Sequence, residues 1–257
     1  MHKNVEKMSI NYSPNFDLNK RTSSKVKYLI FHYTGMRSEN AAIRRLTSKS
    51  SKVSCHYFIK RNGDIVKIVP DLYIAWHAGI SSWKKDKSLN SNSIGIEISN
   101  PGHDYKYKNF SQKQITSIID LSKNLKKKYK IKKENILGHS DIAPFRKIDP
   151  GPKFPWIKLY KSNLVFDPSK KITINNLNLI KNWFKKNKIF SAKKRTLFIL
   201  AYFGYDTIRA QNNHFFYRKL LFVYQAHYLQ KNVSGKLDYK TSNFIFKHFL
   251  NYLLTKK

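Results

Sequence analysis

The segment GHSDIAPFRKIDPGP, residues 138–152, places a histidine and an aspartate at the two ends of a loop stiffened by glycine and proline. His139 follows a short apolar run that predicts a strand, and Asp149 comes ten residues later. His32 ends another predicted strand, although a single histidine in such a place is more often a core residue. Together, two imidazoles and one carboxylate make the ligand set expected of a catalytic zinc ion, which keeps its fourth position for water. A structural zinc site would need four protein ligands, usually with cysteine, and the chain has one cysteine.

Two further residues have the chemistry that such a metal site would use. Glu97 lies in the strand-like segment IGIEIS, where an ionised side chain between isoleucines is costly unless it has a partner or a function. It is the best candidate for the base that a zinc-bound water needs; the alternative is a glutamate on the solvated face of an edge strand. Lys147, two residues before Asp149, could direct its ammonium group toward a developing oxyanion. In a chain with 50 lysine and arginine residues, position alone is weak evidence for Lys147.

The strands that must position these side chains follow from the apolar pattern. Residues 25–34, KVKYLIFHYT, form a short apolar run and predict a buried strand that contains His32. The isoleucines of residues 93–100 alternate along a second strand, so Glu97 points to the face opposite to theirs. The segment SCHYFIKRNGDIVKIVP predicts a hairpin, because an Asn-Gly dipeptide separates two alternating strands.

Helices are predicted where apolar residues recur every three or four positions. Ser38 and Ser111 are the predicted N-caps of a short and a longer helix. Residues 163–176 are polar and contain a proline, and we interpret them as a linker; four amphipathic segments follow. The sequence therefore predicts an α/β domain over residues 13–162, with a mixed central β-sheet flanked by helices, and a small all-helical domain over residues 177–257.

Five segments occur in an order and spacing that resemble a known family. They are FHYTGM, SCHYFIKRNGDIVKIV, IAWHAG, LNSNSIGIEISNPGH and ILGHSDIAPFRKIDPGPKFPW. They are similar to the zinc-dependent N-acetylmuramoyl-L-alanine amidases of the AmpD and AmiD type, whose fold is shared by peptidoglycan recognition proteins and phage amidases. The resemblance extends from Ser13 to Leu159. It implies hydrolysis of the amide that joins N-acetylmuramic acid, or its 1,6-anhydro form, to L-alanine in peptidoglycan or muropeptides.

The resemblance assigns a role to each candidate residue. His32, His139 and Asp149 match the family's three ligands to one zinc ion, while Glu97 and Lys147 match its catalytic pair. In the implied mechanism the glutamate moves a proton from water to the departing amine, and the lysine stabilises the oxyanion. All three ligand positions and the glutamate are present, which argues against the alternative, a non-catalytic peptidoglycan-binding receptor of the same fold.

Other positions in the matching segments carry weaker expectations. His77 in AWHAG and Asn100 in SNPGH match positions that line the substrate groove, so we predict that they bind substrate. A core role and a site role are equally open for His56. Phe145 occupies a position where the family more often has a smaller residue. We expect this larger side chain to alter the wall of the substrate groove. Asp141 has no ligand role in the family, and we interpret it as a cap that stabilises the loop.

The C-terminal helical segments have a looser counterpart. LAYFGYD and FVYQAHYLQKNVSGKLDYKTSNFI resemble the three-helix peptidoglycan-binding module that follows the catalytic domain in the AmiD branch. The alternative is a helical extension that only packs on the catalytic domain.

The chain is strongly basic, with 50 Lys and Arg against 15 Asp and Glu and a formal net charge of +35. Since the excess is spread along the chain, two interpretations stay open: a lysine-rich composition, or a field that attracts carboxylate-bearing substrates. Charge alone, without a recognised motif, gives no reason to expect a nucleic-acid partner. We expect a peptidoglycan or muropeptide substrate and a monomer, although the sequence does not fix the oligomeric state.

The expected location follows from what the sequence lacks. Cys55 has no second cysteine to pair with, and its apolar neighbours predict a buried thiol. No apolar core of a signal peptide and no run of about 18 apolar residues is visible, so we expect no membrane span. Cytoplasmic residence is the default expectation, and the periplasm or cell envelope is the alternative. The missing leader favours released 1,6-anhydro muropeptides as substrate, whereas the helical module favours the intact wall.

Overall fold

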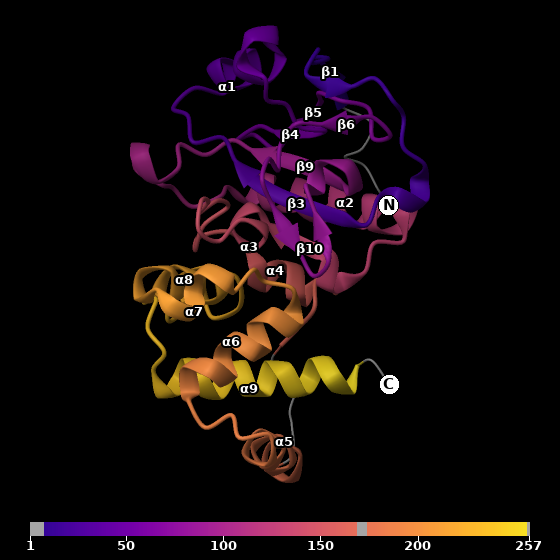
Figure 1. Cartoon of the computed structure of the whole chain (residues 1–257). Helices are drawn as coiled ribbons and strands as arrows, with labels where there is room; N and C mark the ends of the chain where they lie inside the picture. Colours follow the sequence, from indigo (N-terminus) through magenta and orange to yellow (C-terminus); the bar gives the residue numbers. More distant parts are fainter. Residues whose placement is uncertain (1–7, 169–173, 256–257) are drawn as a thin grey trace.

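A six-stranded mixed β-sheet lies at the centre of the N-terminal part of the chain (Figure 1). The computed structural model describes residues 8–168 and 174–255, with the backbone alone for residues 174–176. Neighbouring strands are parallel except for one antiparallel hairpin, so the predicted mixed sheet is confirmed. In sheet order, the strands are β1 (Met8–Ile10), β5 (Ile65–Lys67), β4 (Tyr57–Ile59), β9 (Ser93–Ile98), β3 (Tyr28–Tyr33) and β10 (Ile136–Gly138).

The two central strands carry the predicted ligand and the predicted base side by side. β3 and β9 are parallel, and their register places His32 directly opposite Glu97. Both strands are almost entirely buried, as expected when helices and loops cover both faces of a parallel sheet. The apolar run of β3 and the alternating isoleucines of β9 therefore predicted these strands correctly.

Helices cover the two faces of the sheet. α2 (Gln112–Tyr129) packs on the face that carries the isoleucines of β9, and α1 (Glu39–Thr47) lies on the opposite face. Ser111 and Gln114 form a capping box at the start of α2, and the side chain of Ser38 caps α1. Both predicted helices and both predicted N-caps are confirmed. The predicted hairpin is β4 and β5, and Cys55 is fully buried beside it.

Several short elements complete this part of the chain. β10 leads directly into the four-residue helix α3 (His139–Ile142), and α4 (Trp156–Lys161) follows after a loop. Two antiparallel pairs lie outside the main sheet: β2 (Phe16–Asp17) with β6 (Ile74–Ala75), and β7 (Ser82–Trp83) with β8 (Asp86–Lys87).

The C-terminal part is helical and shares a hydrophobic core with the sheet. Ile30 of β3 and Ile142 of α3 belong to the same buried cluster as Leu200 and Leu221 of the helical part. Figure 1 shows α8 beside α3 and α4, with α9 farther from the sheet. The four predicted helical segments are confirmed, and the short α7 was not predicted. The helices are α5 (Ile174–Lys186), α6 (Ala192–Phe203), α7 (Ile208–Asn212), α8 (His214–Tyr228) and α9 (Tyr239–Leu254).

The predicted linker, residues 163–176, includes residues 169–173, which lie outside the described residues. Its first residues are not detached from the sheet, because Leu164 and Val165 are buried in the same core cluster as α2. The division of the chain into two domains joined by a linker stays a prediction.

Candidate metal centre and active-site cavity

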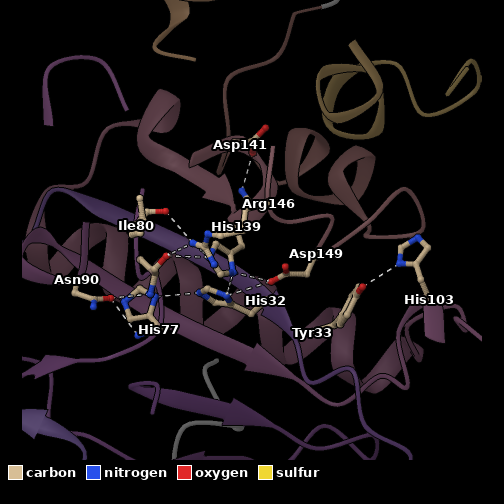
Figure 2. A network of polar contacts seen from close by, with 12 residues as sticks. His32, Tyr33, His77, Ile80, Asn90, His103, His139, Asp141, Arg146 and Asp149 are labelled. Atoms are coloured by element: carbon tan, nitrogen blue, oxygen red, sulfur yellow. Dashed lines mark hydrogen bonds and ion pairs between the residues drawn. The ribbon is translucent and has the colours of Figure 1, made fainter. Parts of the chain in front are cut away.

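Three predicted ligand atoms form a small triangle at the ends of β3 and β10. His32 Nδ1 lies 3.0 Å from His139 Nδ1, and Asp149 Oδ2 lies 3.2 Å and 3.1 Å from these two nitrogens. His32 comes from β3, His139 from the first turn of α3, and Asp149 from the loop that follows (Figure 2). All three side chains are buried. The tertiary structure therefore brings the predicted ligand set to one point.

The size of this triangle fits a tetrahedral metal ion. With bonds of about 2.0–2.1 Å, two ligands of a tetrahedral zinc ion lie about 3.3 Å apart, close to the three observed separations. Two neutral imidazoles and one carboxylate also match the ligands of catalytic zinc sites. Burial, with His139 nearby, lowers the pKa of His32 to about 4, so this imidazole is in the neutral form that binds metals. The described residues thus include a group able to hold a metal ion.

His77 fixes the orientation of the ligand His32. His77 Nδ1 lies 3.0 Å from His32 Nε2, and its own Nε2 lies 3.1 Å from Ser93 Oγ, which donates to the carbonyl of Leu89. One assignment of protons satisfies both contacts of His77: His32 Nε2–H donates to His77 Nδ1, and His77 Nε2–H donates to Ser93. This assignment leaves the lone pair of His32 Nδ1 directed at the triangle. Figure 2 shows His77 on the side of His32 away from Asp149.

The backbone of β9 makes room for this histidine. A Cβ atom at Gly95 would lie 2.4 Å from the ring of His77, so no larger residue fits there while the ring keeps its place. His77 also lines the cavity described below, but both ring nitrogens are engaged inside the protein. Substrate binding by His77 stays a prediction, and its contacts favour the orienting role.

His139 is oriented from the opposite side by a backbone carbonyl. Its Nε2 lies 3.1 Å from the carbonyl oxygen of Ala78, so Nε2–H donates there and the Nδ1 lone pair is free for the metal. Arg146 Nη2 donates to the same carbonyl at 2.8 Å and to that of Ile80 at 2.8 Å. Sequence reasoning did not single out Arg146. Its position beside Lys147, within the ligand loop, was the available signal.

Glu97 lies beside the triangle as a partly buried acid with few hydrogen-bond partners. Among the described residues, its Oε2 has no hydrogen-bond partner. Burial raises its pKa to about 8; the charge of Asp149 acts in the same direction, and Lys147 opposes both. The alternative interpretation placed Glu97 on the solvated face of an edge strand. This alternative is wrong, because β9 is a central strand of the sheet. Because Glu97 also lines the cavity described below, its carboxyl group is placed to exchange a proton with a molecule bound there.

An open cavity of about 970 Å³ gives access to this group. His32, Glu97, His139, Lys147 and Asp149 all line it. The cavity therefore contains every residue predicted to act as a metal ligand or in catalysis. Its volume lies near the upper end of the range typical of ligand sites.

Two other predicted residues lie away from the reacting groups. Asn100 is buried, and its amide is engaged by the loop that follows it: Nδ2 donates to the carbonyl of Lys108, and Oδ1 accepts from the backbone N–H of Gly102. Asn100 is not among the described residues that line the cavity, so its contacts favour a structural role over the predicted substrate binding. His56 is also buried, and its Nδ1 accepts from the backbone N–H of Gly95, which favours the core role.

Phe145 and Asp141 both face the helical part of the chain. The ring of Phe145 packs edge-on against Phe216 of α8, with centroids 5.2 Å apart, and it is absent from the cavity wall. The expectation that Phe145 bears on the groove wall is therefore not met. Asp141 Oδ2 accepts from the backbone N–H of Gly138 at 2.7 Å, so the predicted capping role is confirmed.

Within the described residues, no helix is long and apolar enough to cross a membrane.

Comparisons with known proteins agree with this geometry. The family model described as N-acetylmuramoyl-L-alanine amidase matches residues 22–152. The N-acetylmuramoyl-L-alanine amidase AmiD of Escherichia coli is 33% identical over 237 residues, which are 84% of this chain and 80% of that protein. AmiD solved in complex with the substrate anhydro-N-acetylmuramic acid-L-Ala-D-gamma-Glu-L-Lys superposes with a TM-score of 0.73, at 29% identity and over 93% of both chains. AmpDh3 of Pseudomonas aeruginosa also gives a TM-score of 0.73, at 27% identity, over 95% of this chain and 96% of that one.

Proposed function

Because this chain belongs to the N-acetylmuramoyl-L-alanine amidase family, we propose that it hydrolyses the amide between N-acetylmuramic acid, or its 1,6-anhydro form, and L-alanine. Such an enzyme serves the turnover and recycling of peptidoglycan. One observation carries the proposal: the His-His-Asp triangle and the side chain of Glu97 line the same open cavity.

Zinc is the metal that we propose for the triangle. His32 Nδ1, His139 Nδ1 and Asp149 Oδ2 would hold it. When bound by three protein ligands with one open position, zinc supplies Lewis-acid polarisation of a carbonyl and lowers the pKa of water. His77 and the carbonyl of Ala78 keep the two imidazoles in the tautomers that this binding requires.

Glu97 and Lys147 would act on the substrate. With a metal ion held by the triangle, the nearby positive charge would ionise Glu97, which could then take a proton from the attacking water and return it to the departing amine of L-alanine. Lys147, at the cavity wall, places a positive charge near the oxygen that becomes negative as the carbonyl is attacked. The charge of Lys147 already lowers the pKa of Glu97 against the effect of burial, so the two side chains act within one electrostatic field.

The test is release of free stem peptide from muropeptides by the purified full-length chain. We expect about one zinc ion per chain and peptide release that stops on chelation and returns on adding zinc. The alternative, a peptidoglycan-binding receptor, gives a different result: zinc-loaded chain that binds sacculi but liberates no peptide would refute the enzyme proposal.

The form of the substrate and the compartment belong to one further proposal. The structure of AmiD was solved with an anhydro-muropeptide, and we propose that this chain also accepts that form. A cytoplasmic chain would meet released 1,6-anhydro muropeptides, whereas a chain in the periplasm or cell envelope would meet the wall itself. Turnover of anhydro-muropeptide compared with intact sacculi separates the two, and cell fractionation with an antibody against the chain gives the compartment.

We also propose that the helical residues 177–257 contact the wall polymer. A cavity of about 360 Å³ between α5, α6 and α9 is lined by Lys181, Arg195 and Tyr239, a combination able to bind the carboxylates of stem peptides. Lys181→Glu should weaken pelleting with sacculi. Lys127→Glu, the same charge change at an exposed position on α2, is the matched control; equal weakening by both variants would assign the effect to net charge.

A further inference from the structure

A buried carboxylate joins the metal-ligand helix to the helical part of the chain. Asp141 lies two residues after the ligand His139 and is 1% exposed. Besides the backbone N–H of Gly138, it accepts hydrogen bonds from His227 Nδ1 at 2.7 Å and from the hydroxyl of Tyr205 at 2.6 Å. Each donor is needed, because a buried carboxylate without partners is costly. The cap of α3 is therefore completed by residues more than 60 positions away in sequence.

His227 is held so that its Nδ1 faces Asp141. Its ring stacks on Trp156 of α4, with centroids 3.6 Å apart and planes at 14°, and on Tyr228 at 3.8 Å. The hydroxyl of Tyr160 donates to the carbonyl of His227 at 2.8 Å. Turning the imidazole would move Nδ1 away from Asp141 and break this hydrogen bond. His227, which is 3% exposed, is thus a rigid donor.

Tyr205 is the second donor from the helical part, and it too is fixed. Its ring packs edge-on against Trp83 of β7, with centroids 4.8 Å apart. Burial and the charge of Asp141 raise the pKa of the Tyr205 hydroxyl well above its ordinary value, so it keeps its proton and donates.

The helical part also contacts the middle and the far end of the ligand loop. Phe145 packs against Phe216, and Lys219 Nζ donates to the carbonyl of Phe145 at 3.5 Å. Beyond Asp149, the side chain of Gln230 donates to the carbonyls of Pro152 and Phe154 at 2.6 Å and 2.7 Å. Residues 138–154 supply two of the three ligands and are therefore held at their start, middle and end by α8 and its neighbours.

We propose that His227 and Tyr205 are positioning residues of the metal centre. They fix Asp141, which fixes the start of α3 and with it the imidazole of His139 relative to Asp149. Metal affinity depends on ligands being held in place before the ion binds, and groups behind the ligands commonly contribute to it. Because His227 and Tyr205 belong to the helical part of the chain, this part contributes to the active site in addition to any binding role of its own. The inference rests on the proposed zinc site.

The test measures the zinc Kd of the full-length chain by competition with a chelator, at a temperature well below the Tm of the zinc-free protein. We expect His227→Ala to weaken zinc binding about 10-fold, the lower end of the effect of outer-shell partners. His227→Asn should restore most of the affinity, because its amide N–H can replace the donor. Tyr205→Phe removes one hydroxyl and keeps the ring, so it should fold normally and weaken zinc binding about 3-fold.

A matched control lies on the same helix. Tyr224 of α8 forms a hydrogen bond of 2.9 Å with His248 of α9, and both residues are buried in the helical part. His248→Ala removes a buried histidine whose ring stacks on Phe166 and Phe203 and whose Nδ1 is hydrogen-bonded to Tyr224. We expect it to lower the Tm of the zinc-free chain while leaving the zinc Kd unchanged.

The outcomes separate positioning from general stability and from the zinc proposal itself. An unchanged zinc Kd in both His227→Ala and Tyr205→Phe overturns the inference, as does equal weakening by His248→Ala. Should His227→Ala not fold, Tyr205→Phe and His227→Asn decide the question. A wild-type chain that binds no zinc refutes the proposed zinc site, a result that differs from every outcome of the variants.

Discussion

Two acids on opposite faces of the sheet, the buried Asp71 and the partly buried Glu97, have opposite surroundings. Asp71, on the face covered by α2, is 4% exposed. Burial alone would raise its pKa, but the surrounding donors lower it well below the ordinary value. Its carboxylate is contacted by Tyr57, Lys67, Lys128 and Tyr129, at distances of 2.5–3.1 Å.

Glu97, on the other face, has no such support. Its pKa is raised to about 8 by burial, and Oε2 has no hydrogen-bond partner in the described part of the chain. The difference shows how a functional carboxylate differs from a structural one. Partners that would stabilise the ionised acid would also occupy the lone pairs needed for proton transfer.

The largest expected contrast is in turnover. Glu97→Gln keeps the shape of the side chain and removes the base, so peptide release should fall by about 10²–10⁴-fold with zinc still bound. Asp71→Asn should leave turnover by the folded protein within about 3-fold of wild type, since Asp71 lies on the far face of the sheet. Release kinetics on a muropeptide measure both. A turnover loss in Asp71→Asn comparable to that in Glu97→Gln would contradict the division into a structural and a functional carboxylate.

Stability should change in the reverse order. Asp71→Asn breaks a buried network and leaves its donors poorly paired, which should cost about 3 kcal/mol. Glu97→Gln removes an acid that must take up a proton when the zinc-free chain folds, so stability near neutral pH should stay the same or rise. Urea unfolding of the zinc-free proteins gives both values. A loss of stability in Glu97→Gln as large as in Asp71→Asn would mean that Glu97 also has a structural role.

The two acids should also give the zinc-free chain opposite pH dependences. Folded Glu97 holds its proton up to about pH 8, whereas an unfolded glutamate loses it near pH 4.3, so stability should fall as the pH rises between these values. Asp71 has a lowered pKa, so its contribution is present above about pH 4 and lost as the pH falls further. Thermal unfolding should show Tm falling by roughly 10 °C from pH 5 to pH 8. Glu97→Gln should flatten that slope; an unchanged slope would contradict the assignment to Glu97.

The smallest effects should come from single donors to Asp71. Tyr57→Phe and Tyr129→Phe each remove one hydroxyl and leave the other contacts in place, so each should cost about 1 kcal/mol with turnover unchanged. A sum of the two losses well below that of Asp71→Asn would assign the remainder to the two lysines.

Most elements around the site could be predicted from local sequence. The apolar run of β3, the alternating isoleucines of β9 and the caps of α1 and α2 are local patterns, and the structure confirms each. The ligand types were also readable, because His139 and Asp149 end a loop stiffened by proline and glycine. The likeness to a family then agreed with the grouping of His32 with these two residues and supported Lys147, for which position alone was weak evidence.

Partnerships between distant residues were decided by the tertiary structure. Asp141 was predicted as a loop cap. Its hydrogen bonds to Tyr205 and His227 span 64 and 86 positions in sequence, so no local sequence pattern could predict them. His77 was expected at the substrate, whereas packing over Gly95 places its ring behind His32. The sequence by itself determined which residue types could bind a metal and move a proton. Only the folded chain decided which of them keep a free lone pair, because burial and hydrogen-bond partners depend on every element that packs around a side chain.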